Sequence, residues 1–88
     1  MQGDFESGYH HGLHLFQTGR YPEAIAAFTQ VLSLQPESSE AHLYLGRSFL
    51  GEGMSDEAAA EFKEAIRLHS DDRKTGYWLA IALMRSTR

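Results

Sequence analysis

A repeat of 34 residues constrains this chain more than any other feature. Glu6 and Glu40 are separated by that spacing. So are seven further pairs of identical residues, namely Gly12 and Gly46, Gly19 and Gly53, Glu23 and Glu57, Ala24 and Ala58, Ala26 and Ala60, Phe28 and Phe62, and Leu34 and Leu68. A fixed period of a few tens of residues is typical of stacked-repeat proteins, in which each unit buries its apolar face against the next. The sequence therefore predicts two copies of one structural unit and a shorter third segment.

Each unit of the repeat reads as a pair of helices joined at a glycine. Apolar residues recur three and four positions apart on both sides of Gly19 and Gly53, which is the spacing of one helix face. Pro22 suits the first turn after Gly19, because a proline lacks the N–H that would have no partner there. After Gly53 we expect Ser55 to cap the next helix. The apolar stripes that follow are Ala24, Ile25, Phe28, Val31 and Leu32, and Ala58, Phe62, Ala65 and Ile66.

Prolines and acidic residues set the remaining helix bounds. Pro36 ends the second helix, and Asp71 and Asp72 start the fifth. The pattern predicts five helices, near residues 5–17, 21–34, 39–52, 55–68 and 72–86.

The residues shared by the two units also predict close packing within each pair. The two helices of a pair can approach closely at the small residues Gly12, Gly46, Ala24 and Ala58. Phe28 and Phe62 fill the space beneath. We expect these residues to be structural.

The same residues resemble the tetratricopeptide repeat, whose pattern is Trp-x2-Leu-Gly-x2-Tyr, then Ala-x3-Phe, then Pro. The second unit matches with His42, Leu45, Gly46, Phe49, Ala58 and Phe62, and the first with Gly8, His11, Gly12, Leu15, Ala24, Phe28 and Pro36. A half unit follows with Gly76, Leu79, Ala80 and Leu83. The chain departs from the pattern at Gly8 and His11, which stand at large apolar sites, and at Ser70, where proline is usual. The resemblance implies an all-α, right-handed α-α superhelix forming a single domain over residues 1–88, with repeats at 5–38 and 39–72 and a closing helix at 73–88.

In the tetratricopeptide family, the first helix of each pair lines a concave surface that binds an extended or helical peptide. The positions of this chain that match are Glu6, Tyr9, His10, Leu13, Phe16 and Gln17, then Glu40, Leu43, Tyr44, Arg47, Leu50 and Gly51, and then Lys74, Tyr77, Trp78, Ile81, Met84 and Arg85. The groove residues that we expect to contact a partner are Tyr9, Leu13, Leu43, Tyr44, Arg47, Lys74, Tyr77, Trp78 and Ile81. Aromatic residues supply rigid contact area, so the predicted function is a protein–protein interaction scaffold that holds an apolar peptide or helix. The aliphatic members equally suit packing between neighbouring helices.

One subclass of the family grips the terminal carboxylate of heat-shock chaperones with Lys, Asn and Arg side chains. The sites that would carry this clamp are here Tyr9, Leu13, Tyr44, Lys74 and Trp78. Only Lys74 keeps a positive charge, so a multi-point grip on a carboxylate is lost. The sequence therefore disfavours chaperone-tail binding.

The closing helix supports a second hypothesis. Residues 77–84 are apolar around the whole helix, and such a helix needs burial on more than one side. Terminal repeats normally show a polar outer face, and about three repeats are usually needed for stability. The alternative function is therefore a self-assembling subunit, or a fragment of a longer repeat array, whose exposed closing helix drives homo-oligomerisation.

Other classes of function have less support. His10 and His14 lie one helical turn apart, as two zinc or nickel ligands would, and metal binding there is the third hypothesis. Neither a metalloprotease glutamate nor a third ligand accompanies them. We predict no metal, no cofactor and no enzymatic activity, since the chain has no cysteine, phosphate loop or paired nucleophile and base.

Charge and hydropathy indicate the partners and the compartment. A net charge of −4 without a basic stripe argues against nucleic acid. No run of about 20 apolar residues predicts a membrane span, so we expect a cytoplasmic protein. We expect the acidic residues of the second helices on a solvated convex face, with Glu64 close to Arg67; these residues are Glu23, Glu57, Glu61 and Glu64.

Overall fold

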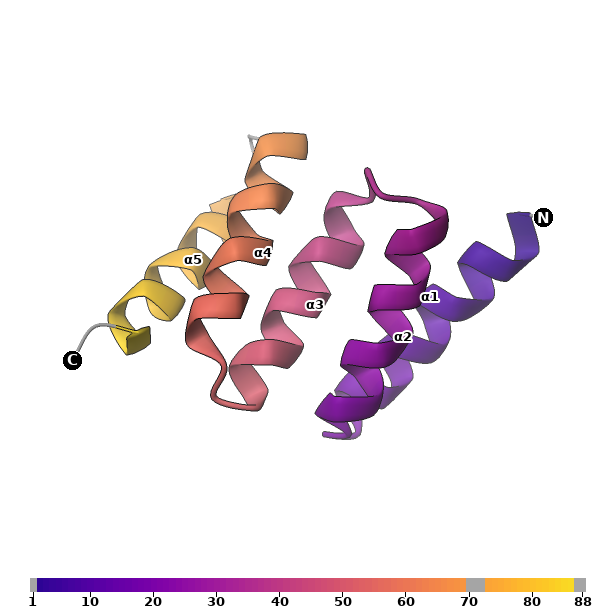
Figure 1. Cartoon of the computed structure of the whole chain (residues 1–88), viewed down its shortest axis with the longest axis horizontal. Coiled ribbons are helices and arrows are strands. Elements are labelled where there is room, and N and C mark those ends of the chain that lie inside the picture. The colour runs from indigo at the N-terminus through magenta and orange to yellow at the C-terminus, as the bar shows by residue number, and fades with distance from the viewer. Residues whose placement is uncertain (1, 70–72, 87–88) are drawn as a thin grey trace.

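The computed structural model is a row of antiparallel helices, each packed on its neighbours along the chain (Figure 1). The structure describes residues 2–69 and 73–86, which contain no strand and form the helices α1 (Gln2–Gln17), α2 (Tyr21–Leu34), α3 (Ser39–Gly51), α4 (Ser55–Leu68) and α5 (Arg73–Ser86). The predicted all-α helical repeat fold is confirmed. The first helix begins at Gln2 instead of near residue 5, and the third ends at Gly51 instead of near residue 52. The expected roles of Ser70, Asp71 and Asp72 fall on residues outside those described.

One glycine turn joins the two helices of each pair, at Gly19 in the first pair and at Gly53 in the second. Gly53 has φ of 76° and Gly19 has φ of 80°, a backbone region that glycine enters without steric cost. The amide of Gly53 donates to the carbonyl of Leu50 at 3.0 Å, and the amide of Met54 donates to that of Phe49 at 2.9 Å. These two bonds form a Schellman motif, which satisfies carbonyls at the end of α3. The same pattern at Gly19 explains why glycine recurs at this position of the repeat.

The expected Ser55 cap of α4 is wrong. Met54 occupies the N-cap position without any side-chain cap, and Ser55 is already the first residue of the helix. The reason is that Met54 belongs both to the Schellman turn and to the start of α4, so the chain enters the helix directly after Gly53. A side-chain cap does form at α3, where the Oγ of Ser38 accepts from the amide of Ala41 at 3.1 Å.

A phenylalanine ring packed on a glycine forms the centre of each helix pair. Phe28 and Phe62 have no exposed surface. A Cβ atom built on Gly12 would lie 2.8 Å from the ring of Phe28, and one on Gly46 would lie 2.6 Å from the ring of Phe62. Real Cβ atoms do not approach other heavy atoms this closely, so glycine is what admits each ring. The close packing predicted for these residues is confirmed.

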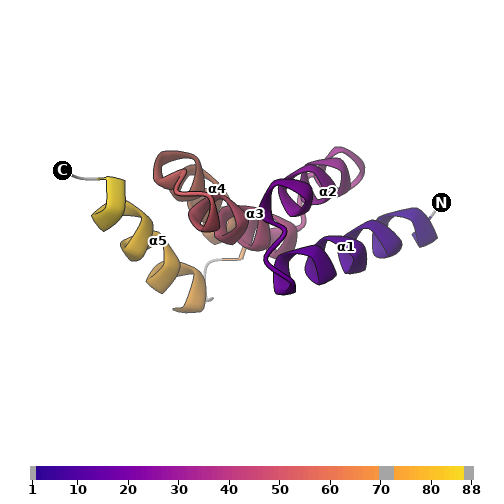
Figure 2. The same ribbon diagram turned by 90° about the horizontal axis from the view of Figure 1, so that it is seen from below.

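The helices form two sides of the stack. Helices α2 and α4 lie on one side, and α1 and α5 lie on the other (Figure 2). The side chains of α3 make contact with both α1 and α5, as the rings around Arg47 show. This arrangement places α1 and α5 on one side of the molecule (Figure 2), where side chains of α3 reach both.

Polar contacts tie the second repeat together where the family pattern has tryptophan. The Nδ1 atom of His42 lies 2.8 Å from a carboxylate oxygen of Glu61, and its Nε2 atom lies 2.9 Å from the carbonyl oxygen of Pro36. His42 therefore links α3 to α4 and to the connection after α2. The expectation that Glu61 is simply solvated is wrong, because this contact leaves only a quarter of its side chain (25%) exposed.

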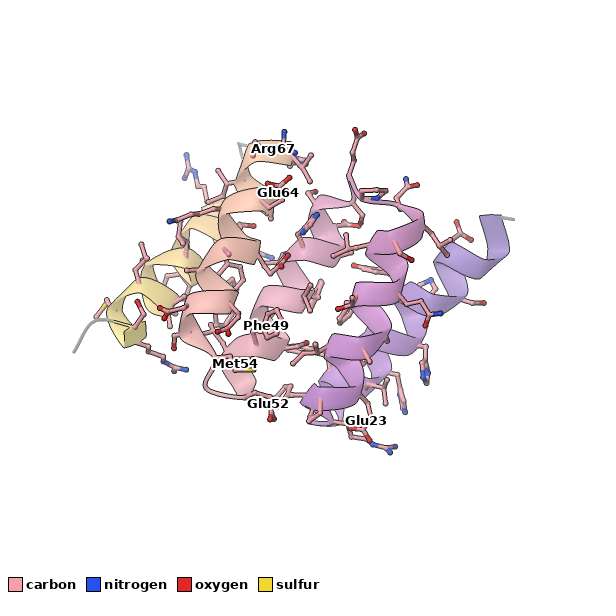
Figure 3. All side chains as sticks on the ribbon, viewed as in Figure 1. Glu23, Phe49, Glu52, Met54, Glu64 and Arg67 are labelled. Atoms are coloured by element: carbon pink, nitrogen blue, oxygen red, sulfur yellow. The ribbon has the colours of Figure 1, made fainter. Side chains whose placement is uncertain are left out.

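Of the other acidic residues expected in solvent, Glu23 and Glu57 are exposed, whereas Glu64 is only partly exposed. Glu64 pairs with Arg67 at the end of α4 (Figure 3), and the hydrogen bond from Arg67 lowers the pKa of the Glu64 carboxyl group. Glu23 pairs with Arg20 at the start of α2 at 3.0 Å. Exposed pairs of this kind add little to stability.

Candidate interaction groove

Tyr44 is the centre of an aromatic cluster that joins α3 to the first helix pair. Its ring centroid lies 5.6 Å from that of Phe16 and 6.4 Å from that of Tyr9, both in edge-to-face geometry. It also stacks on Phe28 at 6.1 Å. Tyr9 and Tyr44 are half-buried and contact the core around Phe28. The structure therefore brings together these two predicted groove residues, which come from different repeats.

Arg47 connects this cluster to α5. The carbon of its guanidinium group lies 4.4 Å from the ring centroid of Trp78, 4.9 Å from that of Phe16 and 5.3 Å from that of Tyr44. These distances are within the range of cation–π attraction. In the described part of the chain, Arg47 forms no ion pair with a carboxylate. The side chain is held in place by aromatic rings from three helices.

A pocket of about 210 Å³ opens beside Arg47. Tyr21 forms part of its wall, and a Cβ atom on Gly51 would lie 2.6 Å from the Tyr21 ring, so the glycine makes room for this ring. Tyr21 was not among the predicted groove residues. The residues that line the pocket are Phe16, Tyr21, Arg47, Leu50, Gly51, Trp78 and Arg85.

The three aliphatic residues of the predicted groove pack against the core. Leu13 contacts the buried cluster formed by α1, α2 and α3, and Leu43 and Ile81 contact the one formed by α3, α4 and α5. All three are half-buried, so each keeps some exposed surface on its helix. The packing role that their spacing indicated is therefore present.

The remaining predicted residues of α5 are in solvent. Lys74 is exposed near the start of the helix. Tyr77 is 65% exposed, although its ring centroid lies 5.7 Å from that of Trp78. Two further large side chains, Leu83 and Met84, are 42% and 76% exposed. We call Tyr77, Leu83 and Met84 the outer apolar face of α5.

The histidines of α1 do not form a metal site with other residues in the described ranges 2–69 and 73–86. His10 and His14 are both exposed, and the ring of His10 packs edge-on against Tyr9 with centroids 5.9 Å apart. No group of three or more His, Asp or Glu side chains in those ranges could hold an ion.

Tyr9 makes the stability of the folded chain sensitive to alkaline pH. Burial, and then the charges of Glu40 and Tyr44, raise the pKa of the Tyr9 phenol from 10.0 to about 12. In the unfolded chain this phenol ionises near pH 10, whereas the folded chain retains the proton until about pH 12. The free energy of unfolding should therefore be unaffected by Tyr9 below pH 10 and fall between pH 10 and 12. When urea unfolding is measured at pH 8 to 11.5, the free energy of unfolding should fall less steeply with pH for Tyr9→Phe than for the wild-type chain. Equal slopes for the two proteins would contradict the raised pKa of Tyr9.

Comparison with known proteins assigns the chain to a family. Residues 9–73, which make up most of the chain, match the tetratricopeptide repeat. The chain therefore belongs to the tetratricopeptide-repeat family. Membership makes it, in general terms, a protein–protein interaction scaffold, and the repeats of this family are typically non-catalytic. Among curated proteins, none matches the chain. None of the helices in the described residues is long and apolar enough to cross a membrane.

Proposed function

We propose that this chain is an adaptor that binds an apolar peptide segment or helix along the groove formed by α1, α3 and α5. The observation that carries the proposal is a continuous series of contacts from three helices at half-buried positions, in which Tyr9 packs on Tyr44, and Tyr44 and Trp78 pack on Arg47. Arg47 and Trp78 also line the pocket. These are the residue types that most often dominate the energy of protein interfaces.

The groove suits a partner because its side chains are already ordered. Tyr44 and Trp78 are held by neighbouring rings and by Arg47, so little conformational entropy remains to be lost on binding. The aliphatic surface of Leu13, Leu43 and Ile81 continues the apolar character along the three helices. An apolar segment with one or two large side chains would complement this surface.

Trp78→Ala should weaken binding of the natural partner by about tenfold or more, the usual effect of removing a hot-spot aromatic residue. The partner is first captured with the intact chain, and its affinity for both forms is then measured by calorimetry. Leu34→Ala is the matched control, because Leu34 is 59% exposed and lies on α2, away from the groove. Trp78 is the single tryptophan of the chain, so its fluorescence should also change on binding. Full affinity in a folded Trp78→Ala variant would contradict the proposal.

The outer apolar face of α5 favours a second candidate function, self-assembly. Tyr77, Leu83 and Met84 present large apolar side chains to solvent on the last helix of the described chain. Burying them against a second copy would remove this surface from water. The pairing would leave the pocket beside Arg47 open, because none of these three side chains lines it.

Met84→Glu should abolish self-association if the second candidate is correct, because a charge would be buried in the contact. The molar mass of the wild-type chain and of the variant is measured by sedimentation equilibrium up to several hundred micromolar. Thr29→Glu, at an exposed site on α2, adds the same charge away from α5 and should leave the mass unchanged. A wild-type chain that stays monomeric over this range would exclude the candidate.

A further inference from the structure

The pocket beside Arg47 has a charge opposite to that of the whole chain. Arg47 and Arg85 both line it, and no acidic residue does. The chain has 12 acidic and 8 basic residues other than histidine, so two arginines in one small pocket reverse the sign of the net charge locally. Neither arginine forms an ion pair with a carboxylate in the described ranges. Bringing two like charges together costs free energy. Asp56 and Glu57, which line a neighbouring pocket with Arg85, offset part of that cost, and an anion bound between the two arginines would offset more of it.

The rings around Arg47 leave its hydrogen-bonding capacity available. Phe16, Tyr44 and Trp78 attract the guanidinium through their aromatic faces, and none of these contacts uses an N–H donor of the arginine on an acceptor. A guanidinium group presents five such donors in a planar fork that matches a carboxylate in two places. Arg47 is therefore fixed in position but still able to donate.

We infer that this pocket receives the side-chain carboxylate of a glutamate within the bound apolar peptide, held by Arg47 and Arg85, an inference that rests on the proposed function. The volume of about 210 Å³ fits one side chain and not a helix. Leu50 and Trp78 supply apolar wall for the two methylene groups of a glutamate. Trp78 also borders the groove, so the peptide on either side of the glutamate would continue along α1, α3 and α5.

The other end of the groove supports the same partner. Glu40, in the first turn of α3, acts on Tyr9 with a negative charge. An acidic residue of the peptide would be repelled there and attracted near the end of α3, where Arg47 lies. The groove therefore selects the position of the acidic residue as well as its charge. Arg47 and Arg85 are not among the sites of the chaperone-type clamp, which carry Tyr9, Leu13, Tyr44, Lys74 and Trp78 here.

The test uses the full chain and a displayed library of random peptides. The peptides that bind should contain an acidic residue next to apolar residues, with glutamate preferred. In a selected peptide made with a free C-terminus, replacing the glutamate by glutamine should weaken binding by about tenfold or more, whereas amidating the C-terminus should have no effect. If amidation weakens binding and the glutamine change does not, the pocket binds a terminal carboxylate and the inference is overturned.

Variants of the chain test the two arginines separately. Arg47→Gln and Arg85→Gln should each reduce affinity for the selected peptide about tenfold, and little further loss should follow when the peptide carries glutamine. Arg73→Gln removes the same charge from α5 outside the pocket and should change affinity less than twofold. Selected peptides that bind the groove without any acidic preference would overturn this inference and leave the proposed function standing. If no peptide is selected, the proposed function fails, and this inference fails with it.

Discussion

Phe62→Ala should lower the free energy of unfolding by about 3 to 5 kcal/mol, and Phe28→Ala should do the same. Each ring is fully buried, and each packs directly on the backbone of a glycine in the facing helix. The helices cannot easily close over the space left by a ring, because the buried alanines Ala24 and Ala58 already let them approach closely. Unfolding in urea, followed by circular dichroism, measures the change for both variants.

Such a loss is large for a chain of 88 residues, since small domains are stable by only about 5 to 15 kcal/mol. The urea unfolding should therefore be repeated with a stabilising osmolyte, so that a variant that is largely unfolded still gives a transition. Leu34→Ala is again the control, because a side chain that is 59% exposed should lose less than about 1 kcal/mol. A loss below about 1 kcal/mol for both phenylalanine variants would mean that the ring-on-glycine contact does not hold the pairs together.

The repeat made much of this fold predictable. Helices α2 and α4 have the predicted bounds, because each follows a glycine turn and carries a regular apolar stripe. The start of α1 was less predictable, since Gln2, Gly3 and Asp4 show no apolar periodicity. The Ser55 cap was wrong because capping preferences concern single side chains, whereas the backbone bonds of the preceding turn determine where α4 begins.

The side-chain contacts in the candidate groove were less predictable than the fold. Tyr44 and Trp78 were expected from their repeat positions, but the stacking of Arg47 depends on how three helices from different units lie together. The contact of Tyr21 with Gly51 could have been predicted from the sequence. The other repeat has glutamine at the position of this glycine and serine at that of this tyrosine, so both residues of one contact differ between the units.

The sequence also contained a signal for the contact between His42 and Glu61. His42 stands where the family pattern has tryptophan, and a polar residue at a large apolar site needs a partner. Glu61 was assigned to solvent because its helix carries several other acidic residues. Periodicity identifies the face on which a residue lies, but it does not identify the residue across the helix interface.

Gly46→Ala should destabilise the chain by about 1 to 3 kcal/mol, although alanine favours a helix over glycine by about 1 kcal/mol. The added methyl group would lie 2.6 Å from the buried ring of Phe62, which has no open space to enter. Gly76→Ala is the matched control, because Gly76 also lies inside a helix and a Cβ atom there meets nothing within 4 Å. It should stabilise the chain by about 0.5 to 1 kcal/mol. Urea unfolding of the two variants should give changes of opposite sign.

A double variant separates the clash at Gly46 from any other effect of the alanine. Phe62→Leu removes the ring atoms that the new methyl group would meet, so it should cost less in the Gly46→Ala background than in the wild-type chain. The difference, measured as a double-mutant cycle, should exceed about 0.5 kcal/mol because the two residues touch. Additive costs, or two glycine variants that change stability in the same direction, would show that backbone propensity and not the ring determines the need for glycine at this position. The clash would instead be confirmed by coupling at Gly46 together with stabilisation at Gly76.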